Sequence, residues 1–492
     1  MIVSDHRRAL ILIALYGAIL AGWFSFARRV ASPIIASANQ GRSSAVLNRL
    51  VQDTRSAAPL ATTVLEHWRH FSGAVLLAGL LHLAIVLWIR LHDPARTGRG
   101  SSPRRRLERW ANPVLILLSF AFLALTVQRG GIQDYYFYLQ MWREVWLGHD
   151  PWFFAYGVFG KYPMNAYGPL FNVFATPALV NPLLPKLLFA GAYLVFAVRL
   201  IKDRGKDRPQ AGLVWPLLLV WFWMPYCWVE LADFGHFDVL VGLLCAATVE
   251  ARVRQRDVIS GVCLGLGVLL KFMPIVLLPF LILDRKRPRY RLLSAAAVTI
   301  ALGLGASVLL WGPSTFRPLI FAAERSSHHL SIYRFLKGRY SPLRWLDFHE
   351  DPDQAAPAFM LIALLWAWLL VRRRMIEPTP AAVLTVLVTL MFYQVGFAQY
   401  HMVLFVLASY WMMSARGAIR ETIPLWVALG CYFGWLSIFD VILSTTNIDS
   451  MGMQEWIGLP TFLLGCFLLV SIVRSPSISR QDTAAPSESL AS

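Results

Sequence analysis

Apolar stretches long enough to cross a lipid bilayer follow one another along most of this chain, and short basic clusters separate them. A helix needs about 17–25 apolar residues to cross the hydrocarbon core of a membrane. The candidate spans are 9–26, 72–92, 111–128, 186–201, 212–229, 237–252, 293–311, 357–371, 381–397, 401–414, 423–443 and 457–474. Only 15% of the residues are charged, against about 25% in a soluble domain. The sequence therefore predicts an all-α polytopic membrane protein with about 12 transmembrane helices.

The basic clusters assign a direction to these spans. They lie at 104–106, 202–208, 252–256, 285–291 and 372–374, which is typical of cytoplasmic loops and argues against a nucleic-acid site despite the net charge of +18. All of them face inward if 168–182 is a re-entrant or interfacial segment and 259–284 is a helical hairpin interrupted by Lys271 and Pro274. Both termini are then cytoplasmic, and the tail 475–492, which has no apolar pattern, is predicted to be disordered.

The loops that face outward in this topology are 27–71, 129–167, 230–236, 312–356, 398–400 and 445–456. In the second of them, Asp134 follows a span within a few residues, in an aromatic and glycine-rich setting. A carboxylate at the membrane surface is well placed as a general base, because partial desolvation raises a carboxyl pKa toward a useful range. The alternative is an ordinary solvated loop acid.

Several other polar residues are candidates for binding a substrate. Lys271 lies in an apolar stretch, where an ammonium needs a partner or must snorkel to the interface. His401 and His236 lie at the outward ends of spans, where a histidine is also an ordinary surface group. The loop 312–356, with Arg334, is basic although it faces outward, so it either binds an anionic lipid headgroup or pairs with its own acids. The five cysteines show no metal-ligand spacing, and no metal site is predicted.

Motifs between 129 and 310 carry a resemblance to a known family. Asp134 is followed by Gly148-His-Asp150-Pro-Trp152, Tyr162-Pro163, Tyr167-Gly-Pro-Leu-Phe171, Gly235-His-Phe-Asp238 and a glycine-rich stretch ending in Lys271-Phe-Met-Pro274. Their order and spacing resemble the GT-C superfamily of membrane glycosyltransferases, and most of all glycosyltransferase family 87, the polyprenol-phosphate-mannose-dependent mannosyltransferases. The looser similarity continues to about residue 415.

The resemblance implies a GT-C-like fold and an inverting sugar transfer on the extracytoplasmic face. The donor is a polyprenyl-phosphate sugar with mannose favoured, no further cofactor is required, and the acceptor is a hydroxyl of a glycolipid, polysaccharide or protein. Asp134 is then the catalytic base and Asp150 a second candidate, although Gly-x-Asp-Pro is also ordinary turn chemistry. The predicted contacts to donor or substrate are Lys271, His401, His236, Tyr135 and Arg334.

The predicted organisation has four parts: an N-terminal two-helix extension at 1–110, a catalytic core at 111–310, C-terminal membrane helices at 311–474, and the tail at 475–492. The absence of an Asn-x-Ser/Thr sequon favours a bacterial inner membrane and a role in the cell envelope. A secondary transporter or lipid flippase is the alternative function. It predicts paired broken helices in two repeat halves and ionisable groups at mid-membrane. A scaffold in an envelope complex leaves the Asp134 loop unexplained.

Overall fold

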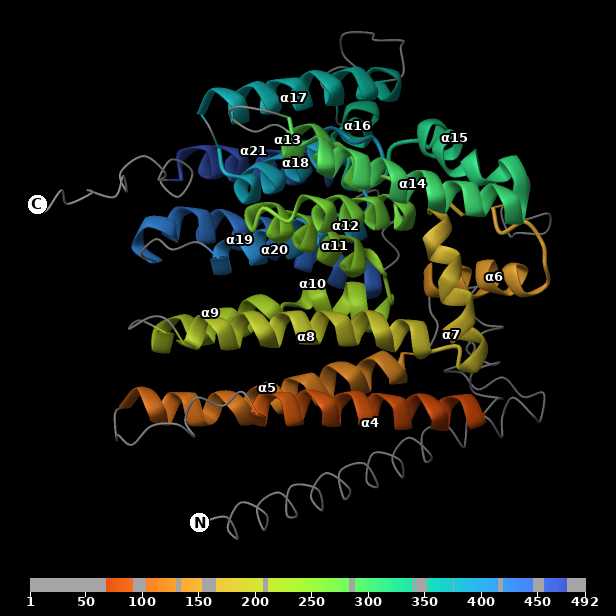
Figure 1. Cartoon of the computed structure of the whole chain (residues 1–492). Coiled ribbons are helices and arrows are strands. Elements are labelled where there is room, and N and C mark those ends of the chain that lie inside the picture. The colour runs from red at the N-terminus through yellow and green to blue at the C-terminus, as the bar shows by residue number, and fades with distance from the viewer. Residues whose placement is uncertain are drawn as a thin grey trace, which may run out of the picture. The chain divides into compact units, whose positions relative to one another are not determined.

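The computed structural model describes residues 68–91, 103–129, 134–152, 165–206, 211–282, 288–338, 341, 352–374, 376–414, 419–445 and 455–475. Every regular element within these ranges is a helix (Figure 1), so the predicted all-α class is confirmed for them. The first predicted span, 9–26, and the tail from 476 onward lie outside the described residues.

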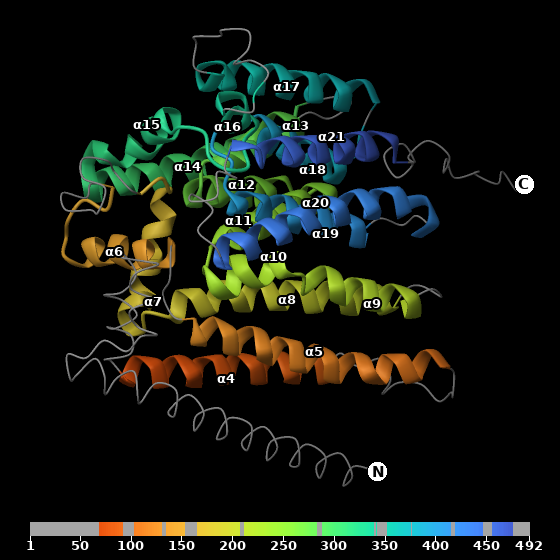
Figure 2. The ribbon, with the colours of Figure 1, turned by 180° about the vertical axis from the view of Figure 1, so that it is seen from behind.

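The first compact unit comprises Met1–Gly148, Phe174–Val220 and Leu231–His236. Its long helices are α4 (Trp68–Leu91), α5 (Pro103–Gln128) and α8 (Leu184–Lys206), and its short ones are α6 (Asp134–Trp146) and α7 (Ala175–Val180). Helices α4, α5 and α8 lie side by side in both views of the ribbon (Figures 1 and 2). Stacking of Phe122 on Tyr193 at 5.7 Å joins α5 to α8, and His82 Nε2 on α4 lies 3.0 Å from the carbonyl oxygen of Ile116 on α5.

The second compact unit comprises His149–Val173, Trp221–Glu230 and Phe237–Ser492. Its longer helices are α11 (Asp238–Val253), α12 (Asp257–Leu270), α14 (Tyr290–Trp311), α17 (Pro352–Arg374), α18 (Pro378–Phe392), α19 (His401–Ser414), α20 (Ile419–Thr445) and α21 (Gly458–Arg474). Its short helices are α10 (Pro225–Cys227), η4 (Met273–Leu277), α13 (Leu278–Ile282), η5 (Gly312–Phe316), α15 (Arg317–Glu324), α16 (Ile332–Lys337) and η7 (Ala398–Tyr400). Helix α9 (Ala211–Phe222), the 3-10 helix η2 (Pro169–Phe174) and the π-helix η3 (Trp228–Asp233) have residues in both units.

The core of the second unit is built around stacked aromatic rings. The indole of Trp221 stacks on Phe405 of α19 with the ring centroids 4.9 Å apart, and its N–H donates a 2.8 Å hydrogen bond to Ser409 Oγ on the same helix. Phe433 of α20 packs edge-on against both rings. An indole N–H that has a partner can be buried without leaving an unsatisfied donor, so this tryptophan joins α19 and α20 tightly.

Six described helical stretches are long and apolar enough to cross a membrane, namely Ser72–Ile89, Ala111–Gln128, Leu184–Lys202, Tyr290–Ala322, Asp353–Arg374 and Ile423–Val441. A seventh is added if Leu217–Asp233 and Asp238–Val253 form one broken span. The predicted count of 12 is therefore not confirmed. Several predicted spans coincide with α18, α19 and α21, which have 15, 14 and 17 residues and fall short of the roughly 20 that a full crossing needs.

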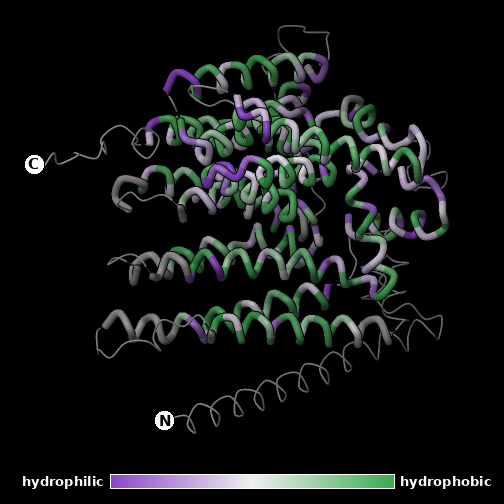
Figure 3. The backbone as a smooth tube through the Cα atoms, in the orientation of Figure 1, coloured by the Kyte–Doolittle hydropathy of each residue, from purple (hydrophilic) through white to green (hydrophobic). Residues whose placement is uncertain are grey.

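Apolar side chains cover the outer surfaces of α14 and α17. Leu309 is 88% exposed and Leu361 is 68% exposed, and only 17% and 11% of the residues in the two apolar windows are buried. In Figure 3 α17 is hydrophobic along its middle and hydrophilic at both ends. A surface of this kind is stable when lipid covers it, so these helices fit a protein embedded in a bilayer.

The segment predicted as re-entrant or interfacial, the predicted helical hairpin and two of the predicted outward loops contain short helices. The segment 168–182 forms η2 and α7, and 259–284 forms α12, η4 and α13, with a break at Lys271. The loop 129–167 contains α6, and the loop 312–356 contains η5, α15 and α16. The re-entrant behaviour of 168–182 and 259–284 and the four domain boundaries stay predictions.

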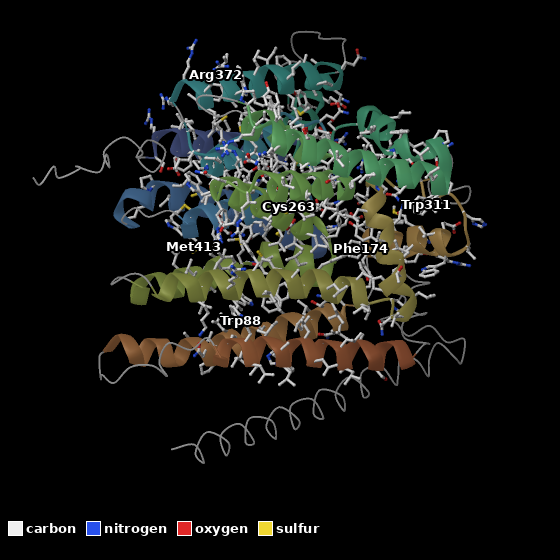
Figure 4. The ribbon with its side chains drawn as sticks, viewed as in Figure 1. Trp88, Phe174, Cys263, Trp311, Arg372 and Met413 are labelled. Carbon is white, nitrogen blue, oxygen red and sulfur yellow. The ribbon has the colours of Figure 1, made fainter. Side chains whose placement is uncertain are left out.

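In the second unit, a basic end of α17 and an aromatic end of α14 lie far apart along the helix direction. Figure 4 shows Arg372 near the end of α17, and Trp311, the last residue of α14, far from it along the helix direction. The cluster Arg372 to Arg374 was predicted to face the cytoplasm, and the segment after Trp311 was predicted to face outward. The two segments lie at opposite ends of this unit (Figure 4), and which end faces the cytoplasm stays a prediction.

Candidate active site

Helix α6 carries Asp134 at its first position and anchors it by an aromatic face. Tyr135, Tyr138 and Trp142 recur at helical spacing and are all buried. Tyr135 and Tyr138 pack against Trp142 with ring centroids 5.9 and 6.0 Å away. The opposite side of the first turn leaves the Asp134 side chain 42% exposed. A carboxylate at a helix N-terminus is also favoured by the helix dipole, so the position suits an ionised acid.

His236 is the partner of Asp134. Its Nε2 atom lies 3.1 Å from Asp134 Oδ2, although the two residues are 102 positions apart in the chain. Gly235 precedes it with a φ of 71°, a left-handed conformation that a side chain would strain. The rings of Phe234 and Tyr138 flank the imidazole at 5.6 and 6.4 Å. The turn therefore points His236 inward, where only 4% of its side chain is exposed.

Lys186 packs against this turn and binds its backbone. The side chain is fully buried, and its Nζ donates a 2.8 Å hydrogen bond to the carbonyl oxygen of Asp233. A Cβ atom on Gly235 would lie 2.9 Å from both Cγ and Cε of this lysine, so the turn packs directly on its methylene chain. The Asp233 carboxylate also meets Arg129, with Nε 3.4 Å from Oδ1. Sequence reasoning missed all three of Lys186, Asp233 and Arg129.

Tyr135 has an internal position. Its side chain is buried, its hydroxyl donates to the carbonyl oxygen of Pro182 at 2.6 Å and accepts from the backbone N–H of Lys186 at 3.2 Å. Burial raises the pKa of this phenol, so the hydroxyl stays protonated and able to donate. We had predicted Tyr135 to contact a substrate. In the structure its hydroxyl ties α6 to the start of α8, and the substrate contact stays a prediction.

Lys271 lies in a second cluster, within the second compact unit. It terminates α12 in an extended conformation, and its ammonium forms a buried ion pair with Asp238 at the start of α11. The face of the Tyr400 ring lies 3.7 Å from Nζ, and the rings of Tyr167 and Phe237 lie at 5.8 and 5.7 Å. Lys271 therefore has the partner that an ammonium in an apolar stretch requires.

Gly168 brings the loop before η2 against this cluster. Its N–H donates to the carbonyl oxygen of Leu270 at 3.2 Å. A Cβ atom here would lie 2.1 Å from the carbonyl oxygen of Leu269, which is a backbone contact that no side-chain movement can relieve. Only glycine permits this approach, and it holds the Tyr167 ring beside Lys271.

The remaining predicted residues are spread over other elements of the second unit. His401 begins α19, is buried, and its Nδ1 lies 2.8 Å from the hydroxyl of Tyr432. Asp150 Oδ1 accepts the N–H of Trp152 at 2.9 Å, which is turn chemistry. Its other oxygen lies 3.9 Å from Arg317. Arg334 lies half-buried on α16.

No group of three or more His, Cys, Asp or Glu side chains that could hold a metal ion occurs within the described ranges. His328 and His329 lie close together, with ring centroids 4.0 Å apart, but adjacent histidines lack the helical spacing of a zinc motif. The chemistry that the two clusters offer is that of carboxylate, imidazole, ammonium and phenol groups.

Comparison with known proteins agrees with the motif succession. The model of glycosyltransferase family 87 matches residues 165–394, just under half of the chain. The match confirms the resemblance to this family that the motifs predicted and implies a membrane glycosyltransferase. No curated protein and no solved structure shows significant similarity to the chain. His236, Lys271 and Arg334 lie within the matched region, whereas Asp134 precedes it and His401 follows it.

Proposed function

We propose that the protein transfers a sugar, with mannose favoured, from a polyprenyl-phosphate-sugar donor to an extracytoplasmic acceptor hydroxyl with inversion, and that Asp134 is the general base. The observation that carries the proposal is the hydrogen bond between Asp134 and His236 at the exposed start of α6. A carboxylate held by an imidazole at one oxygen is oriented for proton transfer.

Exposure decides which member of this pair meets the acceptor. The Asp134 side chain is 42% exposed and that of His236 only 4%, so an incoming hydroxyl reaches the carboxylate and not the imidazole. The base must lie within hydrogen-bond distance of the proton that it removes. His236 is accordingly a positioning residue, which sets the direction of the carboxylate.

The proposed reaction is a single displacement. Asp134 takes the proton of the acceptor hydroxyl, the oxygen forms a bond to the anomeric carbon, and the bond from that carbon to the phosphate oxygen breaks. The polyprenyl phosphate leaves as an anion, and attack from the opposite face inverts the anomeric centre. Cationic groups that meet this phosphate stabilise the charge that develops on it.

Lys271, His401 and Arg334 are the proposed contacts to the leaving phosphate. Lys271 already shares its charge with Asp238, so it would act together with other cations. No cofactor is proposed beyond the donor itself. The partners proposed are the lipid bilayer and a glycolipid, polysaccharide or protein acceptor, and the place proposed is a bacterial inner membrane with both termini in the cytoplasm.

Transfer from radiolabelled donors tests the proposal. Membranes containing the full chain are incubated with polyprenyl-phosphate mannose or arabinose, and labelled product is counted for wild type, Asp134→Asn and Asp150→Asn. General base catalysis contributes roughly 10²–10⁴-fold, so Asp134→Asn should lose at least about 100-fold while Asp150→Asn keeps most of the rate. Equal transfer by wild type and Asp134→Asn, or none from either donor, contradicts the proposal.

One observation favours the transporter alternative. Glu230 of η3 and Asp440 of α20 are both buried acids within candidate membrane helices. Acids inside a membrane domain often belong to ion or proton pathways. The alternative predicts movement of the lipid-linked sugar across proteoliposomes without any change in the sugar linkage, and it predicts that transport depends on Asp440 rather than on Asp134.

A further inference from the structure

Tyr400 connects two cations in the second compact unit. Lys271 Nζ lies over the face of its ring at 3.7 Å, and Arg325 Nη1 lies 3.4 Å from its hydroxyl oxygen. The phenol hydroxyl can accept from the guanidinium while the ring faces the ammonium. Both positive groups therefore approach one side chain, although they lie on segments that are far apart in the sequence.

The two cations differ in how their charge is offset. Asp238 forms a buried ion pair with Lys271 and neutralises it. Within the described part of the chain, Arg325 forms no ion pair with a carboxylate. It meets aromatic faces instead, with Cζ 4.5 Å from the ring centroid of Phe397 and 5.1 Å from that of Phe321. Counted over the residues that the structure describes, the cluster therefore carries one positive charge without a carboxylate partner.

The aromatic contacts fix the plane of the guanidinium. A guanidinium stacked on rings keeps its N–H groups at its edges, and this edge matches the geometry of a phosphate or carboxylate. The backbone is held as well, because Gln394 Nε2 donates to the carbonyl oxygen of Arg325 at 2.7 Å. A half-buried cation held in a fixed orientation stabilises a bound anion more strongly than bulk water does.

The neighbouring surface indicates what carries the anion. Arg325 directly follows α15, on which Leu319 is 46% exposed and Ile320 is 59% exposed. The helical run Tyr290–Ala322, which ends on α15, has 33 residues and contains an apolar stretch that could cross a membrane; it is longer than the roughly 20 residues that one crossing needs. From this excess we infer that α15 lies at the membrane boundary, where hydrocarbon chains and headgroups meet.

We propose that Arg325, oriented by Tyr400, Phe397 and Phe321, binds the phosphate of a lipid phosphate whose hydrocarbon chain lies along α15. The assignment rests on the proposed function in one respect: the lipid phosphate would be the donor's. In this site Arg325 is the principal cation that meets the phosphate, and Lys271 contributes to phosphate binding through its contact with Tyr400. Arg325 was not among the site residues predicted from the sequence.

Binding measured apart from catalysis tests this site. The full chain, purified in a nonionic detergent, is titrated with farnesyl phosphate and followed by microscale thermophoresis. Loss of a charge-assisted hydrogen bond weakens binding by about 10- to 100-fold, so Arg325→Gln should raise Kd by at least about tenfold. Arg325→Lys keeps the charge without the flat edge and should fall between wild type and Arg325→Gln. It also serves as the test variant if Arg325→Gln does not fold.

Arg317→Gln is the matched control, because Arg317 belongs to the same segment but already pairs with Asp150 at 3.9 Å. Its Kd should stay within about twofold of wild type. Equal Kd values for wild type and Arg325→Gln, or equal weakening in Arg317→Gln, would overturn the assignment. Farnesol, which lacks the phosphate, should bind wild type and Arg325→Gln alike. Inorganic phosphate that competes as strongly as farnesyl phosphate would show a site for free phosphate and overturn the lipid assignment.

Asp134→Asn separates this inference from the proposed function. Its binding of farnesyl phosphate should equal that of wild type even though transfer is lost. If wild type transfers no sugar but its binding still depends on Arg325, the lipid-phosphate site stands and the glycosyltransfer proposal fails. If transfer depends on Asp134 but binding does not depend on Arg325, the reverse holds.

Discussion

The ion pair between Lys271 and Asp238 provides the sharpest test of how the second cluster is built. The side chain of Asp238 is fully buried, and that of Lys271 is 8% exposed. Asp238→Asn keeps the shape of the side chain and removes its charge. Lys271 would then lose its charged partner, and the rings of Tyr400, Phe237 and Tyr167, at 3.7, 5.7 and 5.8 Å, would still favour its positive charge.

The expected cost follows from burial. Removing one partner of a buried ion pair destabilises a protein by about 3–5 kcal/mol, because the other charge is left uncompensated. The cation–π contact with Tyr400 recovers about 0.5–2 kcal/mol at most. Asp238→Asn should therefore lower the free energy of unfolding by about 1–4.5 kcal/mol. Lys271→Met should have a similar cost, since it leaves the Asp238 carboxylate alone in the interior.

A double-mutant cycle isolates the pair. Wild type, Asp238→Asn, Lys271→Met and the double variant are unfolded in mild detergent by titration with a denaturing detergent, and tryptophan fluorescence is recorded. Replacing both members of a buried pair by neutral groups is often close to neutral. The double variant should therefore be more stable than either single variant, so the magnitude of the coupling energy should exceed the loss measured in either single variant. Additive losses, or a loss below about 1 kcal/mol in Asp238→Asn, would refute the reasoning.

The same double variant separates structure from catalysis at Lys271. If the double variant folds with near-wild-type stability and still transfers sugar, Lys271 serves the fold. If it folds but its KM for the lipid-linked donor rises, Lys271 also contributes to binding the phosphate. The measurement needs no assumption about the acceptor, because one acceptor is used for all four proteins.

Two glycine substitutions test the local geometry of the clusters. Gly235→Ala places a side chain at a φ of 71° and 2.9 Å from Lys186, so it should lower the free energy of unfolding by about 1–2 kcal/mol and reduce kcat. The control is Gly148→Ala, because Gly148 has a φ of 73° but a Cβ atom there would meet nothing within 4 Å. This control should lose a similar amount of stability and leave kcat unchanged. A kcat loss of equal size in both would contradict the role assigned to the turn. Gly168→Ala meets the carbonyl oxygen of Leu269 at 2.1 Å and should lower the midpoint of thermal unfolding by several degrees; an unchanged midpoint would show that the loop can move away at little cost.

Single residues at the site could be predicted from the sequence, whereas their partners could not. Asp134 was predicted from its place in an outward loop, but the 102 residues that separate it from His236 hide their pairing. The same holds for Lys271. The cost of an ammonium among apolar residues predicts that a partner exists, and only the fold shows that the partner is Asp238.

Lys186 shows where the prediction could have gone further. It lies in Leu-Pro-Lys-Leu-Leu at the start of a predicted span, where a lysine that snorkels to the interface is the ordinary explanation. In the structure it is fully buried and binds a main-chain carbonyl. The rule that identified Lys271 applied here too. The number of spans differs from the prediction because hydropathy detects apolar residues but not helix length. Helices α18, α19 and α21 are shorter than a full crossing requires.

The segment Gly235 to Asp238 supplies a partner to each cluster. Its second residue, His236, pairs with Asp134 in the first compact unit, and its fourth, Asp238, pairs with Lys271 in the second. Glycine is required at the start because the backbone there is left-handed. Each residue type in this short motif thus has a separate physical reason. The peptide chain itself links the residue that would orient the base to the residue that neutralises a lysine. A change at His236 should therefore affect proton removal by Asp134, whereas a change at Asp238 should affect the cost of burying the Lys271 charge.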